Sequence, residues 1–263
     1  KEKKRFAGTE LVGRTLGVVG LGAIGSIIAN LALDLGMDVI GYDPAISVEA
    51  AWQLSSRVKR MDSLEQLLAA ADYVTLHVPA IPETKHLINS KSLGLMKKTA
   101  KILNFAREEI VSADDMLAAL NAGALAGYIS DFPAPNLLGR KDVLLMPHIG
   151  ASTEEAEENC AVMAVDQLKD FLENGNIHNS VNYPRTRMSR NGGSRITFSN
   201  DNVPKVLGSV LSVLADSNLN IIDMVNKSRG EVAYNIIDIE GDFSQAVKDS
   251  IAKVNGVMGV RVL

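Results

Sequence analysis

The stretch TLGVVGLGAIG, residues 15–25, decides the fold of the first half of the chain. An apolar run leads into the spacing GxGxxG, and an amphipathic stretch with helical periodicity follows over residues 24–35. In a strand–turn–helix of this kind, Gly20 makes the turn, Gly22 lets the backbone approach a pyrophosphate, and Gly25 lets helix and strand pack closely. The stretch therefore predicts a dinucleotide-binding unit, with the pyrophosphate at the helix N-terminus.

The next apolar run, residues 37–43, ends in Asp43, eighteen residues after Gly25. An acid at this place accepts hydrogen bonds from the hydroxyls of the adenosine ribose, and its charge repels a 2′-phosphate. Pro44 follows it instead of a basic residue. A glycine-rich turn without a ligand is the structural alternative, but the acid at this spacing favours a cofactor site and predicts NAD over NADP.

Short apolar runs alternate with amphipathic stretches through the first 150 residues. The expected strands are 15–20, 37–43, 72–79, 101–106, 125–130 and 143–147, and the expected helices are 24–35, 63–70, 90–97 and 113–120. This alternation predicts an α/β fold with a Rossmann-type, doubly wound parallel sheet. Ser152 or Thr153 is then expected to cap a long helix that runs to about Glu173.

The composition changes at residues 182–194, which are polar and basic and contain Gly192-Gly193. The pattern after this point is strand, helix, strand, strand, helix, strand within about 70 residues. That order predicts a small βαββαβ domain of the ferredoxin-like type. We therefore expect an NAD-binding domain over residues 1–181, a linker over 182–193 and a small domain over 194–263.

Composition excludes several other classes of protein. The net charge is −4, and the basic run KEKKR at residues 1–5 is short, so a nucleic-acid partner is not expected. No apolar run reaches the roughly 18 residues that span a bilayer. Cys160 is the one cysteine, which fits a reducing, cytoplasmic setting, and we expect it to be a buried structural thiol. The four histidines lack metal-ligand spacing, so no metal site is expected.

Three polar residues follow the later strands, at the carboxyl edge where open α/β sheets bind ligands. Arg107 comes just past the fourth expected strand, and Asp131 and His148 follow two later ones. Hydride transfer with a 2-hydroxy acid needs a guanidinium to hold the carboxylate and a group of near-neutral pKa to exchange the hydroxyl proton. Alone, Arg107 could be a surface ion-pair former and His148 a loop residue. Together beside the dinucleotide motif, they predict an oxidoreductase site.

Several motifs carry a resemblance to a known family. LVGRTLGVVGLGAIG (11–25), LHVPAIPETKHLIN (76–89), NFAREEIV (104–111) and PHIGASTEEA (147–156) resemble the NAD-dependent D-2-hydroxyacid dehydrogenases. CAVMAVDQLKDFLENGNIHNSVNYP (160–184), with the tail after it, is similar to the phosphoglycerate dehydrogenase type that ends in an ACT domain. The resemblance implies oxidation of 3-phosphoglycerate to 3-phosphohydroxypyruvate, the first step of phosphorylated L-serine biosynthesis, by a homo-oligomer.

The resemblance also implies roles for individual residues. Arg107 would hold the substrate carboxylate and carbonyl, His148 would be the acid–base, and Asp131 would face the nicotinamide carboxamide. The cofactor contacts that carry over are Gly20, Gly22, Ala23, Ile24, Gly25, Asp43, Phe105, Ala106, Arg107, Asp131, His148, Ile149, Gly150 and Ala151.

The chain departs from the family pattern in three ways. The Glu expected five residues after Asp131, which binds the histidine, is Asn136, and the glycine after Arg107 is Glu108. The N-terminal substrate half-domain is expected but absent from this sequence. An amide cannot stabilise an imidazolium by charge, so the sequence predicts a catalytic His148 with a weakened partner, and Asn136→Glu should raise the rate.

The tail resembles ACT domains of the serine-sensing kind, which pair side by side and bind amino acids at the shared interface. The resemblance places L-serine as an effector at Asn200, Asn202 and Asn220. An amide donates and accepts hydrogen bonds, which suits a zwitterion, although asparagines before Pro204 are also ordinary helix-start residues. Lys205 replaces a small residue, and its bulk could block a ligand.

Two other functions stay open at this point. A non-enzymatic NAD-binding sensor on the same fold is favoured by Asn136 and Glu108, and a glyoxylate or hydroxypyruvate reductase is the other. Among the remaining residues, His77 is expected to line an adenine pocket or to be a satisfied strand-end residue, His86 and His178 to be solvated, and Trp52 to be packed.

Overall fold

The structure is a computed structural model that describes residues 8–263, apart from the side chain of Glu49. The basic run at residues 1–5 lies outside the described residues. The chain divides into two compact units between Ile149 and Gly150. The sequence placed this division at residue 181; in the structure the long helix and the linker go with the second unit, because the small domain contacts both of them.

The first unit is built on a seven-stranded parallel sheet in the order β3-β2-β1-β4-β5-β6-β7. The strands are β1 Thr15–Val19, β2 Asp38–Tyr42, β3 Lys59–Arg60, β4 Tyr73–Leu76, β5 Lys101–Asn104, β6 Gly127–Ser130 and β7 Val143–Leu145. The order runs outward in both directions from the pair β1 and β4, so the chain switches direction there. This is the doubly wound arrangement that the sequence predicted, and its ligand edge lies at the carboxyl ends of the strands.

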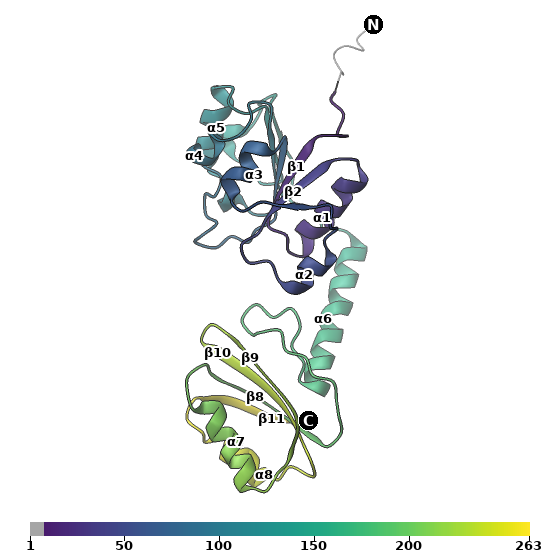
Figure 1. Cartoon of the computed structure of the whole chain (residues 1–263), viewed down its shortest axis with the longest axis vertical. Helices are drawn as coiled ribbons and strands as arrows, with labels where there is room; N and C mark the ends of the chain where they lie inside the picture. Colours follow the sequence, from purple (N-terminus) through teal and green to yellow (C-terminus); the bar gives the residue numbers. More distant parts are fainter. Residues whose placement is uncertain (1–7) are drawn as a thin grey trace. The chain divides into compact units, whose positions relative to one another are not determined.

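Helices cover both faces of this sheet (Figure 1). They are α1 Ala23–Asp34, α2 Val48–Gln53, α3 Leu64–Ala70, α4 Ser90–Leu93 and α5 Ala113–Asn121. One apolar core lies under α1, and a larger one lies under α3, α4 and α5. The sequence did not predict α2 or the two-residue β3, and α4 ends at Leu93 instead of continuing to residue 97. The predicted strands and the other helices of this unit are confirmed.

The second unit begins with a long helix and ends in a four-stranded antiparallel sheet of order β11-β8-β10-β9. Its elements are α6 Glu154–Asn174, β8 Ser194–Asp201, α7 Val206–Asp216, β9 Ile221–Arg229, β10 Val232–Ile239, α8 Gln245–Ala252 and β11 Val257–Val262. Thr153 caps α6 by accepting from the Ala156 N–H at 3.1 Å, as predicted. The βαββαβ order of the ferredoxin-like fold is confirmed.

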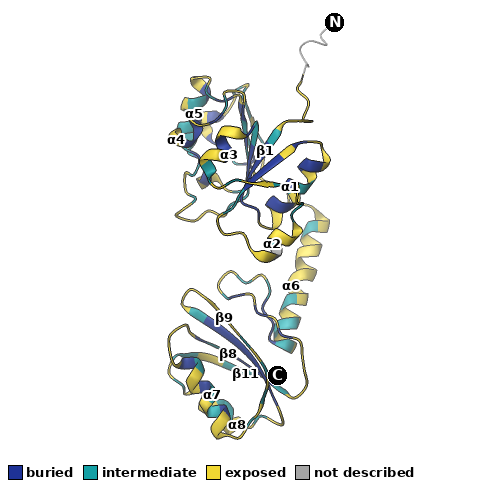
Figure 2. Cartoon of the chain, in the orientation of Figure 1, coloured by how far each residue is buried: buried dark blue, intermediate teal, exposed yellow. Residues whose placement is uncertain are grey.

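Both faces of the small sheet are covered. One face packs on α7 and α8 through a core that includes Ile196 and Phe198, and Figure 2 shows the central strands as buried. On the other face, Tyr234 and Ile236 pack against Ile177 and Met188 of the segment after α6. The linker is therefore part of the core of the second unit.

A buried ion pair fastens the small sheet to the segment before it. Arg195 and Asp238 are 0% exposed, with the Arg195 Nε atom 2.6 Å from an Asp238 oxygen. Of the four other Arg195 N–H groups, one donates to the second Asp238 oxygen at 2.7 Å and three donate to the carbonyls of Asn174, Met188 and Ser189, each at 2.9 Å. One guanidinium thus joins the end of α6 and the linker to the sheet, which explains where the chain divides.

Two sequence expectations about packing are wrong. Cys160 is exposed on α6, so it is no buried thiol. Trp52 is 85% exposed, because it lies on the outward side of the short helix α2. Within residues 8–263, no helix is both long and apolar enough to cross a membrane, and no group of three His, Cys, Asp or Glu side chains in that range could hold a metal ion.

Candidate functional site

The glycine-rich turn follows β1, and its three glycines are needed for different reasons. Gly20 has φ +89°, and a Cβ there would lie 2.6 Å from the His77 carbonyl oxygen. A Cβ on Gly25 would collide with the Gly20 carbonyl oxygen. A Cβ on Gly22 would meet no protein atom within 4 Å, so the fold by itself does not require glycine there. Gly22 therefore leaves room for a group that approaches the backbone from outside.

The first turn of α1 opens directly from this glycine. Gly22 is the N-cap, and within residues 8–263 no side chain caps the first N–H groups of the helix. Gly22, Ala23 and Ile24 are all exposed, and the Ile24 side chain is apolar and 65% accessible. Unpaired amide N–H groups at the positive end of a helix are suited to an anion such as a pyrophosphate.

Asp43 lies beside the same turn, as its spacing predicted. Its Oδ2 atom accepts from the Leu21 N–H at 2.8 Å, and Oδ1 accepts from the Ala45 N–H at 2.9 Å. These bonds fix the carboxylate at the end of β2 while each oxygen keeps a further acceptor position. The arrangement suits hydrogen bonds from ribose hydroxyls.

His77 directly follows β4, the strand next to β1. Its Nε2 atom is 2.9 Å from the Thr75 hydroxyl, and burial lowers the pKa of His77 below the ordinary value of 6.5. It is a satisfied strand-end histidine, one of the two predicted alternatives. Its neutral ring keeps positive charge away from this part of the edge.

The loop after β5 is held by a residue that the sequence analysis did not single out. Asn104 is 0% exposed; its Oδ1 atom accepts from the Ala106 N–H at 3.2 Å, and its Nδ2 donates to the Arg107 carbonyl at 2.9 Å. Phe105 and Arg107 point outward and are exposed. A buried amide at the end of an apolar strand is the signal that could have identified Asn104 as the brace of this loop.

Arg107 presents its guanidinium at the sheet edge with most of its donors free. Nη1 donates to the Ala106 carbonyl at 2.6 Å, which uses one of the five N–H groups. Glu108 begins a single 3-10 turn, and in the described part of the chain it forms no ion pair with Arg107. The acid beside Arg107 therefore leaves the cation available for an external carboxylate.

A carboxylate lies next to His148. Its Nδ1 atom is 2.9 Å from Asp131 Oδ2, and the His148 side chain is 55% exposed whereas Asp131 is 12% exposed. Phe132 lies against the imidazole, with ring centroids 4.9 Å apart. The second oxygen, Asp131 Oδ1, is buried and has no hydrogen-bond partner among the described residues.

These side chains share one edge of the sheet. Asn104 of β5 is in register with Ser130 of β6, and Ser130 with Leu145 of β7. Arg107, Asp131 and His148 thus follow the ends of three adjacent strands, which lie about 5 Å apart from one to the next. The sequence placed all three on this edge, and the structure brings them there together with the glycine-rich turn.

A family model described as "D-isomer specific 2-hydroxyacid dehydrogenase, NAD binding domain" matches residues 1–150. The chain belongs to this family. The D-3-phosphoglycerate dehydrogenase of Synechocystis is 34% identical over 279 residues, covering 100% of this chain and 49% of that protein. The Escherichia coli K12 enzyme of the same name is 33% identical over 267 residues, covering 97% of this chain and 64% of that protein. The chain spans about half to two thirds of the length of such relatives.

Solved structures of this D-2-hydroxyacid dehydrogenase family share the fold. The NAD-complexed form of the D-isomer specific 2-hydroxyacid dehydrogenase of Lactobacillus delbrueckii ssp. bulgaricus has a TM-score of 0.59 and 27% identity. It matches 68% of this chain and 59% of its own. The D-lactate dehydrogenase of Aquifex aeolicus, complexed with NAD and lactic acid, has a TM-score of 0.55 and 28% identity, over 65% of this chain and 59% of its own. NAD is therefore the cofactor of this domain.

The residues of this dehydrogenase domain fit NAD at both ends of the cofactor. At the pyrophosphate end, a Cβ on Gly22 would fill open space beside unpaired helix amides. At the nicotinamide end, the buried and unpartnered Asp131 Oδ1 suits an amide N–H donor. Gly150 and Ala151 lie past the division of the chain, so their contacts, like that of the exposed Ile149, remain predictions.

Asn136 does not contact His148 in this dehydrogenase domain. It lies in a one-turn 3-10 helix, Pro135–Leu137, and its amide donates to Asp114 Oδ1 at 2.9 Å, on the side of α5. The sequence expectation of a weakened partner at Asn136 named the wrong residue, because Asp131 fills the place beside the imidazole.

The remaining histidines behave differently from one another. His86 is exposed, as expected. His178 is not simply solvated: its Nε2 atom is 2.8 Å from Asp170 Oδ2, and the amides of Asn174 and Asn176 also donate to Asp170. This cluster ties the last turn of α6 to the segment after it.

The three predicted effector residues do not form one site within a chain. Asn200 is 3% exposed, accepts from the Asn235 amide at 2.7 Å and donates to the Asp201 carbonyl. Asn202 follows the end of β8 and Asn220 precedes the start of β9. Because β8 and β9 both run antiparallel to β10, these two residues lie at opposite ends of the sheet, about 30 Å apart along the strands.

Proposed function

We propose that the protein containing this chain oxidises 3-phosphoglycerate to 3-phosphohydroxypyruvate with NAD. The observation that supports this most is the Asp131–His148 pair, 2.9 Å apart, on the sheet edge that also holds Arg107 and the glycine-rich turn. The substrate is inferred from the relatives, several of which are named D-3-phosphoglycerate dehydrogenase. The serine-forming pathway and a cytoplasmic location belong to the same proposal.

Arg107 binds the carboxylate of the substrate in this proposal. Four of its five N–H groups have no partner among the described residues. A planar guanidinium can bond both carboxylate oxygens at once, which orients the adjacent C2 carbon, and a remaining N–H can reach the C2 oxygen. Asn104 donates to the Arg107 carbonyl, so the backbone that carries the guanidinium is held in a fixed position.

His148 exchanges the proton of the C2 hydroxyl. A carboxylate only accepts hydrogen bonds, so the contact with Asp131 places the ring proton of His148 on Nδ1 and the lone pair on Nε2. When Nε2 takes the hydroxyl proton, the resulting imidazolium is held by the negative charge of Asp131. Bound NAD supplies the hydride acceptor for the C2 hydrogen, so one proton and one hydride leave the substrate and a carbonyl forms.

The rival hypothesis of a non-catalytic NAD sensor rested on Asn136 and Glu108. Asp131 supplies the carboxylate that Asn136 lacks, and Glu108 leaves Arg107 unpaired, so neither substitution favours the sensor any longer. The glyoxylate or hydroxypyruvate reductase differs only in substrate, and a rate comparison separates it from the proposal.

The test is a substrate panel with the complete protein. We expect NAD reduction with 3-phosphoglycerate to be faster than the reverse-direction reduction of glyoxylate or hydroxypyruvate, judged by kcat/KM. Arg107→Lys keeps the charge but loses the fork, so KM should rise about tenfold or more. A preference for glyoxylate or hydroxypyruvate would overturn the substrate assignment.

We also propose that L-serine binds between two copies of the small domain. The distance between Asn202 and Asn220 within one chain means that a site with both asparagines needs one from each copy. Asn200 would influence such a site only indirectly, through its buried hydrogen bonds. Its side-chain oxygen already accepts from Asn235, and its side-chain nitrogen already donates to Asp201. Lys205, the N-cap residue of α7, has a positive φ of +79°, a backbone geometry that glycine adopts more easily, which fits a position normally held by a small residue. Calorimetry with L-serine on a dimeric sample, giving heat that Asn202→Ala removes, is the expected result; no heat would contradict it.

A further inference from the structure

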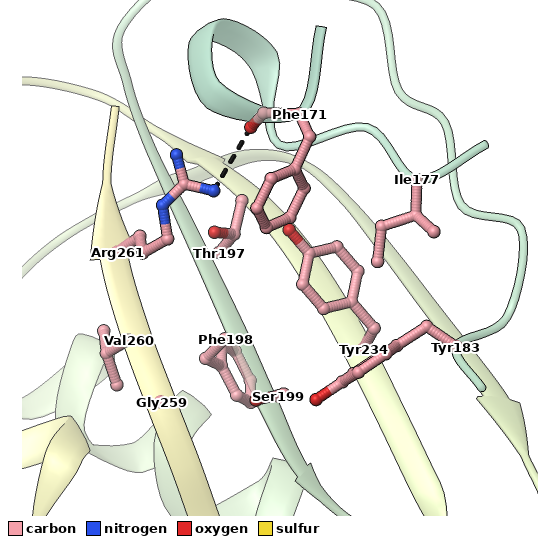
Figure 3. A pocket seen from close by; sticks show the side chains of 10 residues that line it. All are labelled: Phe171, Ile177, Tyr183, Thr197, Phe198, Ser199, Tyr234, Gly259, Val260 and Arg261. Atoms are coloured by element: carbon pink, nitrogen blue, oxygen red, sulfur yellow. Dashed lines mark hydrogen bonds between the residues drawn. The ribbon is translucent and has the colours of Figure 1, made fainter. Parts of the chain in front are cut away.

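A cavity of about 310 Å³ lies in the second unit, against the face of the sheet that carries Thr197 and Tyr234 (Figure 3). Its lining comes from three parts of the chain: the end of α6, the segment after it, and strands β8, β10 and β11. It is separate from the dinucleotide edge, which belongs to the first unit, and Asn200, Asn202 and Asn220 are not among its lining residues. The volume falls within the range of small-molecule sites.

Aromatic rings form much of the wall. Figure 3 shows Phe171 above Tyr234, with Tyr183 on the other side. The rings of Tyr183 and Tyr234 meet edge to face at 6.1 Å, and the Tyr234 hydroxyl donates to the Gly175 carbonyl at 2.8 Å. These contacts fix the rings, so the cavity is formed before any molecule enters it. An apolar body that fills it would be removed from water without rearrangement.

Arg261 provides a charged group at the wall. Its guanidinium stacks on the Phe171 ring at 4.4 Å and donates to the carbonyls of Phe171 and Leu172, at 3.2 and 2.9 Å. Those bonds use two of its five N–H groups, and the other three have no partner in the described part of the chain. The Ser199 and Tyr183 hydroxyls likewise donate to no acceptor among the described residues.

We propose that this cavity binds a small monocarboxylate with an aromatic or branched apolar body. The apolar body would lie among the rings, and the carboxylate would accept from the free N–H groups of Arg261. Because α6, the segment after it and the sheet all line the cavity, an occupant favours the arrangement in which these parts are joined. A strongly polar amino acid such as L-serine suits this lining poorly, so the site differs in chemistry from the proposed effector site.

The experiment uses phenylacetate as the probe and phenylacetamide as its neutral counterpart, both titrated into the chain by calorimetry. The titration extends to about 20 mM because a ligand of this size can bind weakly. We expect saturable binding of phenylacetate and at least tenfold weaker binding of phenylacetamide. Equal affinity for the two would overturn the carboxylate assignment. No binding of phenylacetate would overturn the site.

Two variants locate the site. Gly259→Leu fills the cavity: a Cβ there meets only the Ser199 hydroxyl, at 3.8 Å, so the backbone accepts the side chain. Gly208→Leu makes the same change on α7, where a Cβ meets nothing within 4 Å, and serves as the matched control. We expect Gly259→Leu to abolish phenylacetate binding and Gly208→Leu to leave it within about twofold. Retained binding in a folded Gly259→Leu chain would contradict the proposal.

A measurement on the unaltered chain does not depend on how a variant folds. Phenylacetate should shift the ring NMR signals of Tyr183 and Tyr234 with the same saturation as the calorimetric curve. Arg261→Met, which keeps the stem of the side chain, should weaken phenylacetate binding about tenfold and leave phenylacetamide binding unchanged. Shifts confined to tyrosines outside the cavity would refute the location.

Discussion

Replacing Asp131 by asparagine removes the negative charge beside His148 and keeps the shape of the side chain. The substitution acts on a hydrogen bond of 2.9 Å between the imidazole and a carboxylate. Hydrogen bonds to charged groups contribute about 1.5–3 kcal/mol. His148 is 55% exposed, so water screens part of that energy and the lower end, about 1.5–2 kcal/mol, applies. The expected loss in kcat is about 10- to 30-fold, since 1.36 kcal/mol corresponds to a factor of ten.

The assay is steady-state NAD reduction by the complete protein, combined with nitrogen NMR of the histidine rings in this chain. In the parent, His148 should carry its proton on Nδ1, and in Asp131→Asn this preference should weaken. The matched control is Asn136→Ala, which removes an amide bonded to Asp114 and should change kcat by less than about twofold. A folded Asp131→Asn protein with an unchanged rate, or a parent His148 protonated on Nε2, would refute the pairing.

Three further predictions concern the cofactor turn and stability. Gly22→Ala should leave the melting temperature unchanged yet weaken NAD binding at least about tenfold. Gly25→Ala should destabilise the fold, because the added Cβ collides with the backbone. An equal loss of stability in both variants would be inconsistent with the geometry. The Thr15 N–H and the Lys97 ammonium hold the pKa of Asp72 below its ordinary 3.8, so its stabilising effect is present above that pH and is lost as the pH falls through the lowered folded-state value. Asp72→Asn should therefore cost about 2 kcal/mol in urea unfolding at pH 7, and this cost should shrink as the pH is lowered below 3.8; a pH-independent cost would count against it. Arg195→Met should destabilise by about 3–5 kcal/mol, since it leaves Asp238 buried without its partner, and Arg195→Met with Asp238→Leu should recover much of that loss.

The sheet and its glycine-rich turn could be predicted because their signals are local. GxGxxG, the acid at Asp43 and the alternation of apolar runs each depend on residues close in sequence. The same holds for Thr153, a residue of the N-cap type directly before a helical pattern. What failed at this level were short elements, such as α2 and β3, that contain too few residues to show a period.

The partner of His148 could not be predicted, because it depends on how two loops close. Asp131 and His148 are seventeen residues apart and follow different strands, so their contact is a matter of side-chain direction at adjacent strand ends. Family spacing pointed to Asn136, which turns toward Asp114 instead. The exposure of Trp52 was missed for a similar reason, since an amphipathic pattern does not say whether a short helix covers its apolar face.

The packing of α6 and the linker against the small domain could not be predicted from the sequence either. It depends on Arg195, a residue within an expected strand, whose guanidinium reaches carbonyls of three residues in the preceding segment. A polar and basic composition predicted a linker over residues 182–193, but Met188 within it and Ile177 just before it are buried against the sheet.

The most direct test of the account compares the complete protein with its His148→Ala variant, measuring NAD binding and NAD reduction with 3-phosphoglycerate on the same samples. We expect the variant still to bind NAD and to reduce it at least about 100-fold more slowly, because it has lost the group that takes the hydroxyl proton. A complete, folded parent protein that binds NAD but never reduces it with any 2-hydroxy acid would contradict the account.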